Sequence, residues 1–214
     1  MLFALIQRWL RPVPFAPEIA AFRAADLIAP PAPGAVLFVG SSSIRMWDNL
    51  AADMAPFRVV NRGFGGSSIR DVVRNFANVA TLPNPRAIVF YCGDNDLESR
   101  HAPARIIADF ERFMRLKTQR FGAVPVFFAS IKPAPSRAHF RVEREAVNSM
   151  IRQCALDRSD LHYIDIAGPM LESGRLEDLF LPDGLHLSRA GYAIWRVVIL
   201  GALSAVLPVS EAIV

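Results

Sequence analysis

The sequence is poor in cysteine, in lysine and in long apolar runs. Its two cysteines, Cys92 and Cys154, lie far apart in apolar surroundings, which excludes a disulfide scaffold or a cysteine-rich metal site. Lysine supplies only two of the 24 basic residues, and the arginines are spread along the chain. The net charge of +4 therefore forms no basic cluster, and nucleic acid is not an expected partner.

Neither end of the chain carries an ordinary secretory or membrane-spanning signal. In residues 1–16 the arginines follow the apolar run, whereas a secretory signal needs them first, so a cytoplasmic location is expected. Two interpretations of this segment stay open: it packs on the domain, or it makes a peripheral contact with a membrane surface. The apolar run 197–209 is shorter than the roughly 20 residues of an integral span, and we interpret it as part of a closing core helix.

Composition favours one domain with a large core. Apolar residues make up 52% of the 214 residues and charged residues 21%, which excludes disorder and coiled coil. Prolines cluster near the start, on both sides of a helical stretch at 18–28. We therefore expect an N-terminal arm with one helix over 1–34 and a single domain over 35–214.

From residue 35 onward, short apolar runs alternate with segments of helical spacing. Such alternation predicts right-handed crossovers and a parallel sheet, and strands that are apolar throughout predict helices on both faces. We expect a three-layer α/β/α sandwich with five parallel strands in flavodoxin-like order. The expected strands are 35–40, 57–61, 87–93, 124–131 and 161–166, and the expected helices are 44–54, 68–80, 103–120, 138–157 and 189–207.

Ligands of open α/β sheets bind beyond the carboxyl ends of the strands, so the residues after each strand are the candidates for function. Three serines, Ser41, Ser42 and Ser43, follow the first strand. A serine there commonly caps the next helix through its hydroxyl oxygen. The alternative is a nucleophilic serine at a helix start, where backbone amides stabilise developing negative charge.

Glycines and amide side chains follow the next two strands. The glycines of 61–68 fit a tight turn or a backbone N–H, most readily that of Gly66, directed at an oxyanion; their spacing matches neither phosphate-binding fingerprint. After the third strand, Asn95 lies between Asp94 and Asp96. These residue types are common in turns, and the Asn95 amide is equally suited to donate to the same oxyanion.

One of the four histidines has a carboxylate placed to orient it. Asp183 and His186 are three residues apart in the loop that enters the last helix. One imidazole nitrogen can therefore be held by the carboxylate while the other faces the cleft. A nucleophile, a base, an orienting acid and oxyanion donors thus all follow strand ends.

These residues resemble the SGNH hydrolase superfamily, the GDSL-type esterases and lipases. The resemblance covers about 35–207, and its blocks occur in family order at 40–43, 65–66, 93–96 and 183–186. The first block departs from Gly-Asp-Ser-Leu, because Ser41 replaces the acidic residue. The resemblance implies that Ser42 is the nucleophile, His186 the base and Asp183 its partner, with Ser42, Gly66 and Asn95 forming the oxyanion hole.

The implied function is hydrolysis of small or short acyl esters through an acyl-enzyme, with no cofactor and no metal. Activity should rise with pH through roughly 6–7, as an imidazole base loses its proton. The alternatives are an acyltransferase, a thioesterase or lysophospholipase using the same site, or a non-catalytic binding module. Four basic residues near the motifs are candidates for a substrate pocket: Arg45, Arg62, Lys132 and Arg137. The oligomeric state does not follow from the sequence.

Overall fold

A computed structural model describes residues 15–208, so the predictions for residues 1–14 lie outside the described residues. Its sheet has five parallel strands in the order β2-β1-β3-β4-β5, which confirms the expected flavodoxin-like sheet. The strands are β1 (Val36–Gly40), β2 (Val59–Gly63), β3 (Ala87–Tyr91), β4 (Val126–Ala129) and β5 (Leu161–Ile164).

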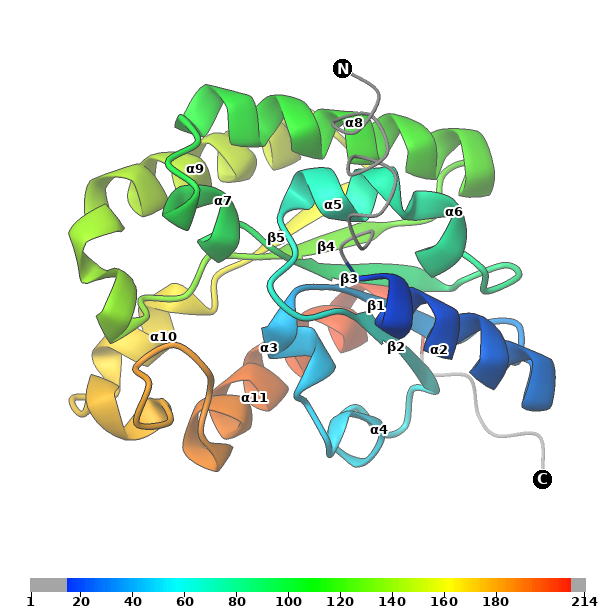
Figure 1. Ribbon diagram of the computed structural model, residues 1–214, viewed down its shortest axis with the longest axis horizontal. Coiled ribbons are helices and arrows are strands. Elements are labelled where there is room, and N and C mark those ends of the chain that lie inside the picture. Colours follow the sequence, from blue (N-terminus) through cyan, green and yellow to red (C-terminus); the bar gives the residue numbers. More distant parts are fainter. Residues whose placement is uncertain (1–14, 209–214) are drawn as a thin grey trace, which may run out of the picture.

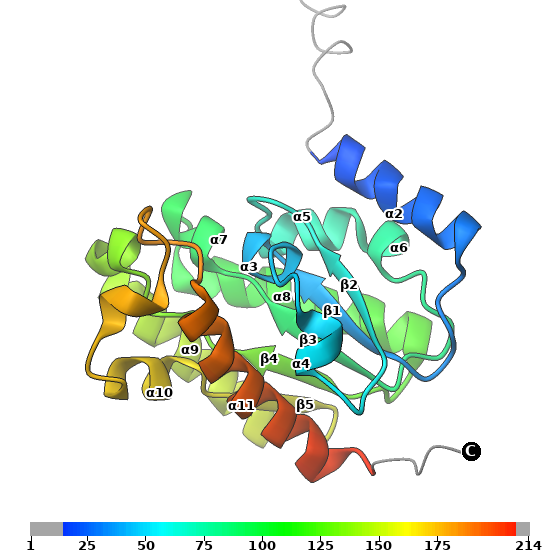
Figure 2. The same ribbon diagram turned by 90° about the horizontal axis from the view of Figure 1, so that it is seen from below.

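Helices cover both faces of the sheet, as Figure 1 shows. One face carries α5 (Ile69–Arg74), α6 (Phe76–Val79), α8 (Pro103–Phe121) and α9 (Arg141–Leu156). The other carries α3 (Ser42–Arg45), α4 (Leu50–Asp53), α10 (Ala167–Glu172) and α11 (Arg189–Val206). The short α7 (Asp94–Glu98) follows β3, and two 3-10 helices span Pro135–Phe140 and Leu176–Leu179. Helix α2 (Ala16–Ile28) lies beside α6 (Figure 2), and its Asp26 pairs with Arg62 of β2.

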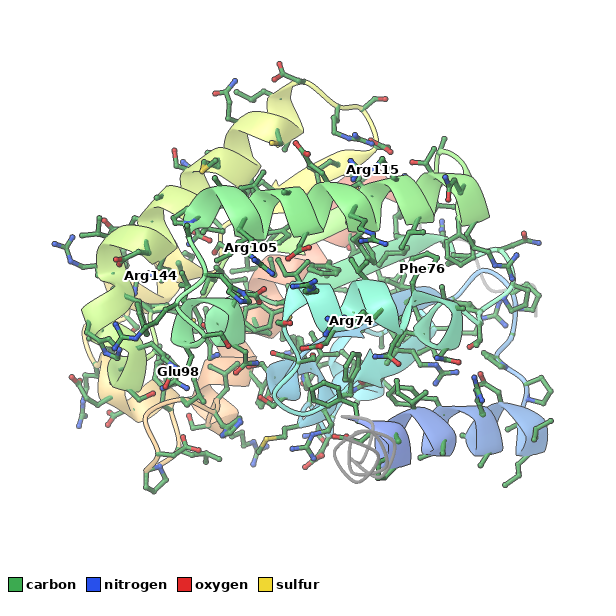
Figure 3. The ribbon with its side chains drawn as sticks, turned by 45° about the horizontal axis from the view of Figure 1, so that its top comes forward. Arg74, Phe76, Glu98, Arg105, Arg115 and Arg144 are labelled. Atoms are coloured by element: carbon green, nitrogen blue, oxygen red, sulfur yellow. The ribbon has the colours of Figure 1, made fainter. Side chains whose placement is uncertain are left out.

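Two apolar clusters form the core, one on each side of the sheet. Side chains alternate along a strand, so Leu37 and Val39 join the cluster under α5 and α8, whereas Val36 and Phe38 join the cluster under α11. Figure 3 shows Phe76 of α6 close to α8, where its ring meets Phe113 edge-on with the ring centroids 5.8 Å apart.

Several elements differ from the sequence-based expectation. The structure has two short helices in place of each of the expected helices 44–54 and 68–80. Apolar spacing indicates which residues face the core, and this spacing can continue across a turn between two helical segments. The second strand is β2, two residues later than expected; its register against β1 begins at Val59, and Phe57 packs into the core ahead of it.

Helix α11 is the one described helix that is long and apolar enough to cross a membrane by length and composition, and 22% of it is buried. Such a helix is weak evidence of a span, since the core helix of a globular domain passes the same test. Trp195, Ile199 and Leu203 on one side of α11 are fully buried in the cluster that contacts the sheet. This packing agrees with the expected closing helix.

Candidate active site

The carboxyl ends of β1, β2 and β3 meet at one edge of the sheet and carry three of the candidate residues. Ser42 is the first residue of α3, two residues after the end of β1. Ser41 occupies the N-cap position, but its side chain makes no capping hydrogen bond, so the capping interpretation does not describe this turn. Ser42 is 8% exposed, and as a first-turn residue its N–H has no acceptor within the helix.

Ser42, His186 and Asp183 form a hydrogen-bonded chain although Ser42 and His186 are 144 positions apart. The Ser42 Oγ lies 3.0 Å from the His186 Nε2, and the His186 Nδ1 lies 2.6 Å from the Asp183 Oδ2. Both distances suit hydrogen bonds, and the second is short, as for a charge-assisted pair. The structure thus joins a hydroxyl, an imidazole and a carboxylate in one hydrogen-bonded chain.

The local turn holds the Asp183 carboxylate toward the imidazole. Its Oδ1 accepts hydrogen bonds from the backbone N–H groups of Leu185 and His186, both at 2.9 Å. The hydrogen bond from the His186 side chain, helped by these two amides, lowers the pKa of Asp183 to about 2. Asp183 is therefore ionised at any ordinary assay pH and available to orient the ring.

Gly66 lies on the loop between β2 and α5, and Asn95 lies in α7, the helix that follows β3. Gly66 has a φ of 72°, a left-handed conformation that favours glycine, and a Cβ added there would have no neighbouring atom within 4 Å. The Asn95 Nδ2 donates to the carbonyl oxygen of Ser67 at 3.0 Å, which ties the start of α7 to the glycine loop. An amide NH₂ has two hydrogens, so this bond leaves one for a ligand.

The glycine loop ends in a well-capped helix. Ser68 and Asp71 form a reciprocal capping box at the start of α5. The buried carboxylate of Asp96 accepts from the Ile69 N–H, its Oδ2 at 3.0 Å. Burial raises the pKa of Asp96 to about 7, against the opposing effect of that hydrogen bond.

The four basic residues expected to line a substrate pocket have different positions. Lys132 is 1% exposed and pairs with Asp94, and Arg62 is 5% exposed and pairs with Asp26. Neither is placed to meet a substrate, because each is needed to neutralise a carboxylate away from solvent. Arg45 is well exposed beside Gly65, and Arg137 is partly exposed and paired with Glu98 at 3.2 Å.

Sequence reasoning missed Glu18, whose carboxylate reaches the glycine loop from α2. The Gly65 N–H donates to the Glu18 Oε1 at 2.9 Å. The local pattern around Glu18 indicates only a helix, and no spacing relates it to a residue 47 positions away. Only the docking of α2 beside β2 reveals the contact.

A hollow of about 480 Å³ lies between the α3–α4 connection and the start of α11. Its walls include Met46 and Leu187, which are near Ser42 and His186 in the chain, but Ser42, Asp183 and His186 themselves do not line it. Among residues 15–208, no three His, Cys, Asp or Glu side chains are grouped so that they could hold a metal ion.

Several solved structures have the same fold as this chain. A GDSL-like lipase from Bacteroides thetaiotaomicron has a TM-score of 0.69 at 19% identity, over 88% of this chain and 100% of that chain. A carbohydrate esterase family 3 protein from Talaromyces cellulolyticus has a TM-score of 0.64 at 18% identity, over 80% and 97%. An acetyl-xylooligosaccharide esterase from a Geobacillus has a TM-score of 0.65 at 15% identity, over 78% and 94%.

No sequence among the curated proteins matches this chain. The model of the GDSL-like Lipase/Acylhydrolase family, in contrast, matches residues 34–194. That segment contains Ser42, Gly66, Asn95, Asp183 and His186, and it leaves out Glu18. The chain therefore belongs to the GDSL-like lipase/acylhydrolase family and is a hydrolase that acts on ester bonds.

Proposed function

We propose that the protein hydrolyses carboxylic esters of small acyl groups through an acyl-enzyme on Ser42. One observation carries the proposal: the continuous contact from the Ser42 Oγ through the His186 imidazole to the Asp183 carboxylate. A serine hydroxyl is a weak nucleophile near neutral pH, and a base within hydrogen-bond distance activates it.

The chemistry proceeds in two displacements. The Ser42 Oγ bonds to the acyl carbon while its proton passes to the His186 Nε2, and the collapsing tetrahedral intermediate expels the alcohol, which takes that proton. Water then attacks the acyl-enzyme with His186 again as base, and the acid leaves as Ser42 regains its proton. Asp183 keeps the Nδ1 side of the ring fixed and stabilises the imidazolium formed in each step.

The tetrahedral oxyanion needs donors that are already in place. The Ser42 N–H, the Gly66 N–H and the remaining Asn95 amide hydrogen are the donors that this edge of the sheet offers. Removal of one such donor typically costs about 10²–10³ in turnover. The hydrogen bond from Asn95 to Ser67 supports this assignment, because it holds two of the three donor segments together.

Small acyl groups, and acetate first, are the substrates that we propose. Two structural relatives are described as a carbohydrate esterase and an acetyl-xylooligosaccharide esterase, which favours acetylated sugars in this chain as well. The exposed Arg45 beside the glycine loop supports a polar or acidic alcohol portion.

The test is a Ser42→Ala variant, which should lose on the order of 10⁶-fold in turnover of nitrophenyl acetate while its melting temperature stays near the wild-type value. Ser43→Ala is the matched control. Ser43 is 1% exposed, and within the described structure its hydroxyl has no hydrogen-bond partner, so removal of that hydroxyl should leave turnover unchanged.

A fluorophosphonate probe should label wild-type protein at Ser42 and leave the Ser42→Ala variant unlabelled. An active Ser42→Ala variant, or a wild-type protein that resists the probe, contradicts the proposal. Esters of rising acyl length, assayed beside acetylated sugars, then measure the preference for small acyl groups.

A further inference from the structure

We propose that Glu18, on a helix outside the family-matched segment, is a positioning residue that directs the Gly66 N–H into the oxyanion hole. The inference rests on the proposed function and extends it to the N-terminal helix. Its basis is the contact between the Glu18 carboxylate and the Gly65 N–H, together with the way in which α2 is anchored.

The glycine loop needs an external restraint at this point. Gly65 and Gly66 are consecutive glycines, and glycine has the widest conformational freedom of all residues. Rotation of the Phe64–Gly65 peptide would carry the next peptide, which bears the Gly66 N–H, away from Ser42. The 2.9 Å hydrogen bond from the Gly65 N–H to Glu18 opposes that rotation.

Other hydrogen bonds fix the loop on both sides of the glycine pair. Before it, the Phe64 N–H donates to the Gly40 carbonyl at 3.0 Å. After it, the Ser67 hydroxyl donates to the Phe64 carbonyl at 3.1 Å, and the Ser67 carbonyl accepts from Asn95. The hydrogen bond to Glu18 supplies the restraint at Gly65, between these two ends.

Helix α2 is held firmly enough to act as a support. Ile19 is 7% exposed and joins the core, and Phe15 packs edge-on against Phe64 with ring centroids 5.0 Å apart. Farther along the helix, Asp26 pairs with the buried Arg62 and accepts from the Thr81 hydroxyl at 2.7 Å. The position of Glu18 is therefore set by contacts other than its own hydrogen bond to Gly65.

Arg45 completes the arrangement on the side of the nucleophile. Its Nε lies 3.9 Å from the Glu18 Oε1, and it follows Ser42 within the same short helix. A Cβ on Gly65 would lie 3.1 Å from the Glu18 Oε1 and 3.2 Å from the Arg45 Nε. The carboxylate thus bridges the helix of the nucleophile and the loop of the oxyanion donor.

The experiment compares Glu18→Ala with Glu18→Gln in steady-state hydrolysis of nitrophenyl acetate. Glu18→Ala removes the acceptor, so kcat should fall about tenfold, less than for loss of a whole donor, while KM stays within about twofold. Glu18→Gln keeps an amide oxygen as acceptor and should recover most of the wild-type kcat. Glu111→Ala, at an exposed position on α8, is the control and should match the wild type.

A Glu18→Ala variant with wild-type kcat overturns the inference, and so does a change confined to KM. Equal losses in the Ala and Gln variants that follow their melting temperatures indicate a purely structural role and also overturn it. If Glu18→Ala does not fold, Glu18→Asp, whose carboxylate is one methylene too short, must show the loss of kcat. Failure of fluorophosphonate to label Ser42 in the wild type refutes the proposed function, whereas normal labelling with an unaffected Glu18→Ala variant refutes only this inference.

Discussion

Asp96 is a buried carboxylate that has no role in the proposed mechanism. It is fully buried, accepts from the backbone at the start of α5, and faces the negative charges of Asp109 and Asp71. Burial raises its pKa from 3.8 to about 7, so the folded protein holds this proton in a pH range where the unfolded chain has lost it. Folding is therefore coupled to proton uptake at Asp96.

The sign of that coupling predicts a difference between wild type and Asp96→Asn. Between pH 4 and 7 the folded state binds more protons at Asp96, so its contribution to the free energy of unfolding falls as the pH rises. For a pKa difference of about three units, this contribution to the free energy of unfolding falls by on the order of 4 kcal/mol. The Asp96→Asn variant should not show this fall. Urea unfolding of both proteins across this range measures the difference, and parallel curves would contradict the burial argument.

The grouping of the candidate residues could be predicted from sequence where the signal is local. Asp183 and His186 are three residues apart, and Ser42 follows the end of a strand. Short local stretches of sequence were therefore enough to predict the hydroxyl, imidazole and carboxylate that the structure places together. Lys132 and Glu18 were not readable in this way. Lys132 is buried in an ion pair with Asp94, and Glu18 reaches Gly65 because α2 docks beside the sheet. Both positions depend on contacts between residues that are far apart in the chain.

At the scale of elements, an ion pair joins the end of α8 to the loop before β5. The Lys117 side chain is fully buried, and its Nζ donates to the Asp160 Oδ2 at 2.6 Å and to the Gly122 carbonyl at 3.2 Å. Burial alone would raise the pKa of Asp160, but the hydrogen bonds from Arg158 and Lys117 prevail and hold it at about 2. Asp160 therefore stays ionised over the ordinary pH range.

Asp160→Asn should destabilise the protein by about 3–5 kcal/mol, because it leaves the Lys117 ammonium buried without its counter-charge. Asp178→Asn is the control; its pair with Arg175 is exposed on both sides and should change stability by less than about 1 kcal/mol. Urea unfolding at neutral pH compares the two. A small effect of Asp160→Asn would show that water reaches the Lys117 amine.

Long periodic helices could be predicted, whereas the short ones could not. Helix α8 buries Ile106, Phe110 and Phe113 at helical spacing, and it coincides with the expected helix over 103–120. Helices α7 and α10 have five and six residues, too few for a periodic pattern, and form where the chain leaves a strand. Their existence follows from tertiary packing rather than from local preference.

At the scale of the whole molecule, strand order determines where the candidate site lies. β1 has β2 on one side and β3 on the other, so the loops after these strands diverge and leave a crevice at the end of β1. Alternating strands and helices were enough to predict this edge. They were not enough to predict how closely the backbones approach one another there.

Gly40, the last residue of β1, is where this approach is tightest. A Cβ at this position would lie 1.9 Å from the Tyr91 carbonyl oxygen, the same oxygen that accepts the Ser41 N–H at 3.1 Å. Gly40→Ala must push β1 away from β3, so we expect a loss of about 1–3 kcal/mol or more in stability and a loss of turnover in the remaining folded protein.

Gly201→Ala provides the comparison, because no atom lies within 4 Å of the added methyl group on α11. It should raise stability by about 0.5–1 kcal/mol through helix propensity. Thermal melts and nitrophenyl acetate assays distinguish the two variants. A Gly40→Ala protein with wild-type turnover would show that the position of Ser42 does not depend on the spacing of β1 and β3.

The burial of both lysines has a practical consequence for protein chemistry. Lys117 and Lys132 are the only lysines in the sequence, and their side chains are 0% and 1% exposed and engaged in ion pairs. An amine-reactive reagent therefore finds no accessible lysine on the native protein. The other 22 of the 24 basic residues are arginines. Acylation of either lysine side chain requires the protein to unfold around it. The rate of acylation of these two amines therefore measures spontaneous unfolding in the absence of denaturant.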